Sequence, residues 1–148
     1  MELDLPALAA TEALARTLAP LVRAGDALLL EGPLGAGKTA FARALLRAIC
    51  GDPALEVPSP SYTLVQSYPA QGLVVHHFDL WRLQGPASLV ELGWDEAVRD
   101  MVVVEWPDRL GALLPASALT VSLSLAEGEA RHAVLTGWAE RLSAAGIA

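Results

Sequence analysis

The residues with the clearest chemical potential form one short run, Gly-Pro-Leu-Gly-Ala-Gly-Lys-Thr at positions 32–39. This run fits the pattern G-x-x-x-x-G-K-[ST] in full. Glycines at this spacing let backbone N–H groups turn inward around phosphate oxygens, and a following helix adds its positive N-terminal end. Lys38 would neutralise the β- and γ-phosphates, and the Thr39 hydroxyl would ligate Mg²⁺. The run therefore predicts a phosphate-binding loop (P-loop), with contacts from Gly32, Pro33, Leu34, Gly35, Ala36, Gly37, Lys38 and Thr39.

Residue usage elsewhere in the chain supports this interpretation. Lys38 is the only lysine among 10 basic residues, and a lysine ammonium is a compact charge that reaches phosphates more easily than the wider arginine fork. The chain also contains no asparagine, so it lacks the Asn-Lys-x-Asp element with which GTPases usually recognise guanine. We therefore expect ATP, with Mg²⁺, as the nucleotide.

Two acids follow strand-like apolar runs, Asp79 after LVVHHF and Glu105 after MVVV. Such a pattern places a carboxylate at the carboxyl end of a strand, the edge at which a P-loop lies. A nucleotidase needs a carboxylate near its metal and a group that orients the attacking water. We expect Glu105 and Thr39 to hold Mg²⁺, and Asp79 to orient water or to lie close to the metal. Lys38, Asp79 and Glu105 are the predicted catalytic residues.

The adjacent histidines His76 and His77 must face opposite sides of a strand. Further ligands for a zinc site are missing from the sequence, so we do not expect them to bind metal; one of them would instead face the γ-phosphate region. Glu31, just before the first glycine, is expected to be a solvated residue at a strand end.

The elements that must position these residues alternate between helix and strand. We expect strands at residues 2–5, 27–31, 62–68, 73–78, 101–104, 119–125 and 132–135. Helices are expected at residues 8–23, 38–50 and 138–145, and residues 88–100 should be partly helical. Two short connections, around residues 69–72 and 127–129, predict hairpins. The pattern predicts an α/β fold: a three-layer P-loop NTPase fold in which helices flank a mixed β-sheet, with residues 1–148 forming a single domain.

Composition narrows the function further. The net charge of −7 argues against a large basic surface, so any RNA would be contacted indirectly through a partner. Cys50 is the only cysteine, which excludes an intrachain disulfide and a cysteine-based zinc site. The first residues, MELDLP, carry acid where a signal peptide carries positive charge, and no apolar run approaches the roughly 20 residues of a membrane span. We expect a cytoplasmic protein without a membrane segment.

Four elements in this order, GPLGAGKT, SPSYTLVQSY, HFDLWRL and VVVEWPDRL, resemble the TsaE family, the bacterial ATPases of tRNA threonylcarbamoyladenosine (t⁶A) biosynthesis. The resemblance runs from about Thr11 to about Arg131. It implies that residues 59–63 form a switch-type loop near the γ-phosphate, with Ser61 where the family usually has threonine. Pro33 stands where the family often has Asp, and Ala40 replaces a common second Thr after the P-loop.

The resemblance also implies roles for residues beyond the P-loop. Asp79 matches the essential Asp of the family's His-Phe-Asp-Leu-Tyr-Arg element, in which Trp81 here replaces the tyrosine and Arg82 matches the arginine. Glu105 matches an acidic metal ligand, and Trp106 a tryptophan that could stack on adenine. Thr11 and Arg131 correspond to positions near the base.

Membership would further imply two protein partners, TsaD and TsaB, of which TsaD modifies adenosine 37 in tRNAs reading codons that begin with A. The chain would then be a Mg²⁺-dependent ATPase, weak alone and stimulated by partners, that resets the TsaB–TsaD complex. Two alternatives stay open from the residues. A small-molecule kinase would need a lid, for which residues 83–100 with Arg99 are the only candidate. A nucleotide-sensing binding module would not need both Asp79 and Glu105.

Overall fold

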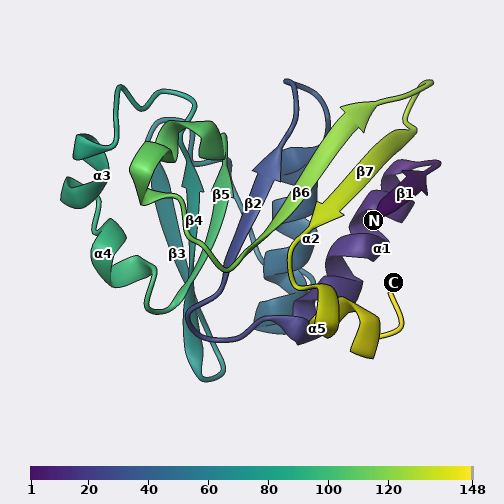
Figure 1. Cartoon of the computed structure of the whole chain (residues 1–148), viewed down its shortest axis with the longest axis horizontal. Helices are drawn as coiled ribbons and strands as arrows, with labels where there is room; N and C mark the ends of the chain where they lie inside the picture. Colours follow the sequence, from purple (N-terminus) through teal and green to yellow (C-terminus); the bar gives the residue numbers. More distant parts are fainter. Residues whose placement is uncertain (148) are drawn as a thin grey trace.

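Seven strands form one sheet in the computed structural model, which describes residues 1–147 (Figure 1). Their order across the sheet is β1-β7-β6-β2-β5-β4-β3. The strands are β1 (Glu2–Leu5), β2 (Ala27–Glu31), β3 (Val65–Ala70), β4 (Leu73–Asp79), β5 (Met101–Glu105), β6 (Ala118–Leu125) and β7 (Arg131–Thr136).

Helices cover the sheet. They are α1 (Leu8–Leu18), α2 (Lys38–Cys50), α3 (Ala87–Glu91), α4 (Trp94–Ala97) and α5 (Ala139–Ala144), with 3₁₀ segments η1 (Ala19–Leu21) and η2 (Pro107–Leu113). Within residues 1–147, none of these helices combines the length and the apolar character that a bilayer span requires.

The centre of the sheet is parallel and its flanks are antiparallel. β6, β2, β5 and β4 run parallel, β3 pairs antiparallel with β4, and β7 pairs antiparallel with both β6 and β1. Both predicted hairpins, β3–β4 and β6–β7, are present. The expected mixed sheet of an α/β fold is therefore confirmed.

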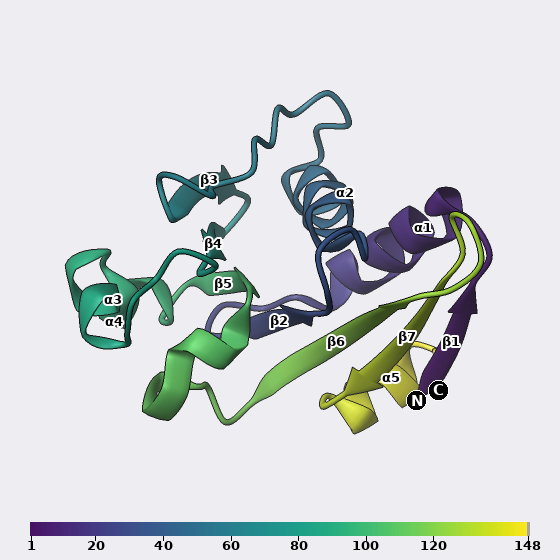
Figure 2. The ribbon, with the colours of Figure 1, turned by 90° about the horizontal axis from the view of Figure 1, so that it is seen from above.

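Each face of the sheet carries its own apolar core. Figure 2 shows α1 and α2 on one side of the strands and α3 and α4 on the other. On one face α1 and α2 pack on residues that include Leu28, Leu30, Val75 and Val103. On the other face α3, α4 and η2 pack on the alternate strand residues, among them Phe78 and Val104. This alternation, with helices on both sides, is the expected three-layer arrangement.

Several predicted element boundaries were wrong for local reasons. The helix predicted over residues 8–23 ends at Leu18, because Pro20 lacks a backbone N–H and a 3₁₀ turn follows. The strand predicted from residue 62 begins only at Val65, because Leu64 has a φ of 67° and its N–H closes a turn onto the carbonyl of Pro60. By contrast, the prediction that residues 88–100 are partly helical is confirmed, because α3 and α4 fall in this region, separated at Gly93, which has a φ of 80°.

Parallel strands bring three chain segments to one edge of the sheet. β2 ends at Glu31 and leads into residues 32–37, while its neighbour β5 ends at Glu105 and the next strand, β4, ends at Asp79. Asp79 and Glu105 are direct cross-strand partners. The two predicted acids thus lie side by side where the P-loop begins.

Candidate functional site

The predicted P-loop, as residues 32–39 are called below, leaves β2 and enters α2 through glycines that other residues could not easily replace. Gly32 has a φ of 143°, and a Cβ added there would collide with the backbone carbonyl of Leu123 on β6. Gly37, with a φ of 101°, precedes the first helical residue, Lys38. Glycine adopts these positive φ values without steric cost, which allows the tight turn. The turn places the loop backbone at the N-terminus of a 13-residue helix.

Lys38 is folded back onto the P-loop. Only 5% of the residue is exposed, its ammonium donates hydrogen bonds to the carbonyls of Gly32 and Pro33, and it lies 3.9 Å from the ring centroid of Trp106. Burial lowers the pKa of Lys38, and the nearby carboxylates of Glu105 and Asp79 oppose that shift. The site therefore contains a desolvated cation that contacts two backbone oxygens and an aromatic face, with two acids nearby.

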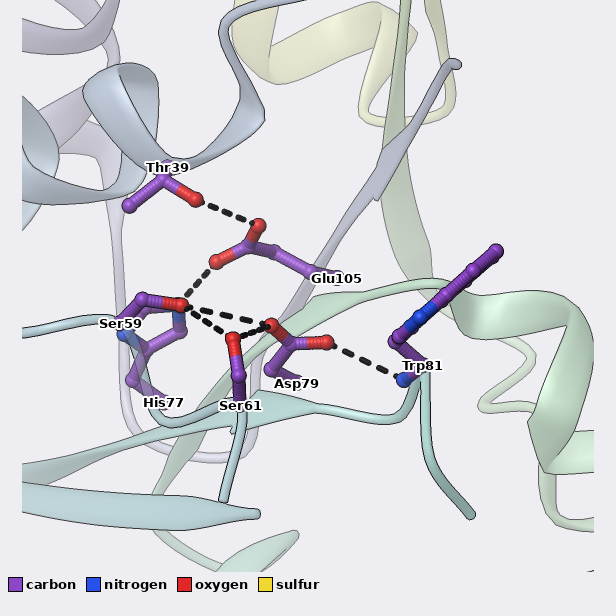
Figure 3. Close-up of polar contacts among 7 residues, drawn as sticks. All are labelled: Thr39, Ser59, Ser61, His77, Asp79, Trp81 and Glu105. Carbon is purple, nitrogen blue, oxygen red and sulfur yellow. Dashed lines mark hydrogen bonds and ion pairs between the residues drawn. The ribbon is translucent and has the colours of Figure 1, made fainter. Parts of the chain in front are cut away.

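Glu105 links α2 to β4 (Figure 3). Its Oε1 accepts a hydrogen bond from the Thr39 hydroxyl at 3.0 Å, and its Oε2 lies 2.7 Å from Nε2 of His77. Glu105 is only 2% exposed. Of the two strand-end acids, it is the one in contact with Thr39.

Asp79 has different partners. Its Oδ2 accepts a hydrogen bond from the Ser61 hydroxyl at 3.2 Å, and a longer one of 3.5 Å from Ser59. The two serine hydroxyls are 2.8 Å apart. The other oxygen, Oδ1, accepts from the backbone N–H of Trp81 at 3.1 Å (Figure 3). Asp79 thus connects the loop at residues 59–63 to the segment that follows β4.

A cavity of about 290 Å³ lies between the P-loop, this loop and the ends of β4 and β5. Trp81 and Trp106 form one wall, with ring centroids 4.4 Å apart and planes at 45°. Trp106 has a φ of 59°, an uncommon conformation for so bulky a residue, which orients its ring toward Lys38. The lining residues are Leu34, Gly35, Gly37, Lys38, Thr39, Ala40, Ser59, Ser61, Asp79, Trp81, Glu105 and Trp106.

Thr11 and Arg131 lie outside this cavity, on the other side of the P-loop. Both line a smaller cavity of about 140 Å³ together with Ala36 and Gly37. Arg131 donates hydrogen bonds to the carbonyls of Gly35 and Ala36, at 3.1 and 3.2 Å. Its guanidinium therefore braces the P-loop backbone from β7. Arg82, which also follows β4, stacks over the ring of Tyr62 at 4.3 Å and does not line the larger cavity.

The oxygen atoms gathered here suit Mg²⁺. The hydroxyl of Thr39 and the carboxylates of Glu105 and Asp79 are hard ligands, as magnesium requires. Residues 1–147 contain no group of three or more His, Cys, Asp and Glu side chains able to hold a metal ion by themselves. In nucleotide sites magnesium is usually held by one or two carboxylates together with substrate phosphates and water.

The bond from His77 to Glu105 is the main feature that sequence reasoning missed. We expected one of the two histidines to face the γ-phosphate region, but His77 is fully buried and is absent from the cavity lining. A signal was available, because His77 precedes Asp79 by two positions and so lies on the same face of β4.

Comparisons with known proteins agree with this architecture. The family described as "Threonylcarbamoyl adenosine biosynthesis protein TsaE" matches residues 5–133. Proteins called tRNA threonylcarbamoyladenosine biosynthesis protein TsaE are similar to this chain. The one from Rickettsia conorii is 35% identical, covering 82% of this chain and 69% of its own length. The one from Streptomyces coelicolor is also 35% identical, covering 90% and 95%.

The crystal structure of YdiB from Bacillus subtilis has the same fold, with a TM-score of 0.78, 26% identity, and coverage of 99% of this chain and 90% of YdiB. Because the family matches nearly the whole chain, including the P-loop and both strand-end acids, the chain belongs to the TsaE family.

Proposed function

We propose that this chain is a Mg²⁺-dependent ATPase of t⁶A biosynthesis. The observation that carries the proposal is the contact between Thr39 and Glu105 at 3.0 Å, beside Lys38 and Asp79 in one cavity. A helical hydroxyl and a strand-end carboxylate in contact are the two protein ligands that P-loop NTPases use for magnesium. The lysine lies next to them, where phosphates would bind.

The position of each residue in the cavity indicates its role in binding or catalysis. The P-loop N–H groups and Lys38 would bind the β- and γ-phosphates, and Thr39 and Glu105 would hold Mg²⁺. When bound, the metal ion neutralises charge that develops on the transferring phosphoryl group. Asp79, joined to Ser61, would orient the attacking water, and the Trp81–Trp106 wall would limit access of bulk water.

The loop at residues 59–63 is the element most suited to control by partners. The hydroxyls of Ser59 and Ser61 connect it to Asp79. Tyr62, within the loop, is 82% exposed. We propose that this ATPase acts on a TsaB–TsaD complex that modifies adenosine 37, and that docking orders this loop and stimulates hydrolysis. The net charge of −7 fits a protein that reaches tRNA only through its partners.

The kinase alternative has little support in the fold. Residues 83–100, the only candidate lid, are packed into the core through Leu89 and Trp94, which are 0% and 2% exposed. Trp94 makes an edge-to-face contact with Phe78 of β4 at 5.1 Å. A segment anchored in this way is part of the scaffold rather than a mobile lid. The sensor alternative does not explain why two buried acids lie in the cavity.

The decisive experiment is ATP hydrolysis by the purified chain, with and without TsaB–TsaD and tRNA. We expect a slow rate alone, a higher rate with partners, and a loss of about 100-fold or more in Glu105→Ala. Glu91→Ala, an exposed acid on α3, is the matched control and should behave as wild type.

Each alternative predicts a different result. A rate that partners do not change, or an active Glu105→Ala variant, would contradict the proposal. Transfer of labelled phosphate to a small acceptor instead of water would favour the kinase. Tight binding without turnover under every condition would favour the sensor.

A further inference from the structure

His77 is a polar side chain that is completely buried at the edge of the candidate site. It lies on the α2 face of β4 between Val75 and Asp79 and is 0% exposed. The neighbouring residue on β5 is Val103, and Glu105 lies diagonally ahead of it. Its Nε2 is 2.7 Å from Oε2 of Glu105 (Figure 3). An apolar side chain would fill this place without the cost of burying a polar ring.

The surroundings of the second ring nitrogen, Nδ1, determine where the proton of the His77 imidazole lies. Nδ1 of His77 is buried and has no hydrogen-bond partner among residues 1–147. A proton placed only on Nδ1 would leave a buried donor unpaired and would set the Nε2 lone pair against the Glu105 carboxylate. The hydrogen-bonding proton is therefore on Nε2, donated to Glu105. Glu105 is the only polar contact that the ring makes in the described chain.

That contact determines which way the carboxylate points. With Oε2 held by His77, the remaining oxygen, Oε1, is directed toward the Thr39 hydroxyl. Metal ligands are commonly oriented in this way by partners behind them. We propose that His77 is a positioning residue that holds the Glu105 carboxylate in the orientation in which it and Thr39 bind Mg²⁺, an inference that rests on the function proposed above.

A purely structural role makes a different prediction. If His77 only filled space, an apolar residue of similar size should preserve magnesium binding, although the fold would lose stability in either case because the buried Glu105 loses one partner. If it positions Glu105, the same replacement should weaken magnesium binding and leave the rest of the nucleotide site unchanged. The two roles therefore separate in metal affinity rather than in stability.

The experiment measures binding of a non-hydrolysable ATP analogue by calorimetry, in EDTA and across a Mg²⁺ series. His77→Leu removes the donor, and His77→Gln restores an N–H close to the position of Nε2. His76→Gln changes the neighbouring histidine, which faces the other side of β4 and contacts Ser67 and Asp100. We expect the Mg²⁺ concentration for half-saturation to rise about 10- to 100-fold in His77→Leu, with little change in EDTA. His77→Gln and His76→Gln should stay close to wild type.

Combining His77→Leu with Glu105→Gln tests whether His77 acts through Glu105. The effect of His77→Leu should disappear in that background, because a residue that acts only through Glu105 has nothing left to position. A folded His77→Leu with wild-type Mg²⁺ dependence would overturn the positioning role alone. An equal effect of His77→Leu in the wild-type and the Glu105→Gln backgrounds would also overturn the positioning role. If His77→Leu does not fold, His77→Gln provides the test. The positioning role is overturned if His77→Gln loses its Mg²⁺ dependence as fully as Glu105→Gln does. Wild-type protein that binds no nucleotide with or without Mg²⁺ would instead refute the proposed function.

Discussion

The ammonium of Lys38 lies 3.9 Å from the ring centroid of Trp106, the residue that directly follows Glu105. The P-loop cation and the end of β5 are therefore in contact through an aromatic face as well as through charge. Trp106 reaches this position because it adopts a φ of 59°. Burial disfavours the charged form of Lys38 and so lowers its pKa, whereas the face of the Trp106 ring attracts that charged form.

Lys38→Met should keep the packing of the lysine stem against Trp106 and remove only the charge. We expect affinity for ATP to fall about 10- to 100-fold, because charge-assisted hydrogen bonds to phosphate contribute about 1.5–3 kcal/mol. Calorimetry with a non-hydrolysable analogue measures the loss. Arg43→Met, which removes a cation from the same helix outside the cavity, is the control, and equal losses in the two variants would point to a general charge effect.

Ser61→Ala should uncouple the loop at residues 59–63 from Asp79. The lost hydrogen bond, 3.2 Å in the structure, contributes about 1 kcal/mol, so we expect partner-stimulated hydrolysis to fall about fivefold. Ser59→Ala should cost less because its bond is longer, at 3.5 Å. Ser61→Thr keeps the hydroxyl and should remain near wild type. A Ser61→Ala variant with full stimulation would show that this hydroxyl does not transmit the effect of the partners.

The sequence was sufficient for the features that depend on local pattern. The glycine-rich turn between β2 and α2, the two hairpins and the strands ending at Asp79 and Glu105 follow from spacing, short connections and apolar runs. The rule that parallel strands share one carboxyl edge then places both acids near Lys38, and the structure brings these residues together.

Features that depend on register or on unusual backbone angles could not be predicted. Spacing alone places His77 on the same face of β4 as Asp79, but its contact with Glu105 also requires the register that pairs Asp79 with Glu105, which is set by the whole sheet. Leu64 and Trp106 have positive φ values that their residue types disfavour, so surrounding packing must impose them. The hydrogen bonds from Arg131 to the P-loop could not be predicted either, because they join positions 95 and 96 residues apart in the sequence.

Arg141 and Asp26 should stabilise the fold without affecting the site. Two hydrogen bonds, of 2.6 and 3.3 Å, join them, and Arg141 also stacks on Trp138 at 4.2 Å. Asp26 precedes β2, at the opposite end from the P-loop. We expect Arg141→Ala to lower the free energy of unfolding by about 2 kcal/mol, because the largely buried Asp26 loses its charged partner and keeps only the hydrogen bond from the backbone N–H of Arg23. Denaturant unfolding measures this.

The control for that variant is Arg99→Ala, since Arg99 is exposed and forms no ion pair within residues 1–147. It should change stability by less than about 0.5 kcal/mol. Nucleotide affinity should be unchanged in both variants. Weaker nucleotide binding in Arg141→Ala would mean that the two ends of β2 are coupled.

His132 should make the pairing of β1 with β7 depend on pH. Its ring lies 3.0 Å from Asp4 and 3.4 Å from Glu2, and these hydrogen bonds, that to Asp4 foremost, raise its pKa above the ordinary value of 6.5. Because the folded pKa is the higher one, the stabilisation is complete below 6.5 and is lost as pH rises through the folded value. Thermal unfolding of wild type and His132→Gln should therefore differ most near about pH 5.5, where carboxylates ordinarily remain ionised, and converge near about pH 8.5. A difference that does not change over this range, or that grows with pH, would show that the contacts of His132 with Asp4 and Glu2 do not depend on its charge.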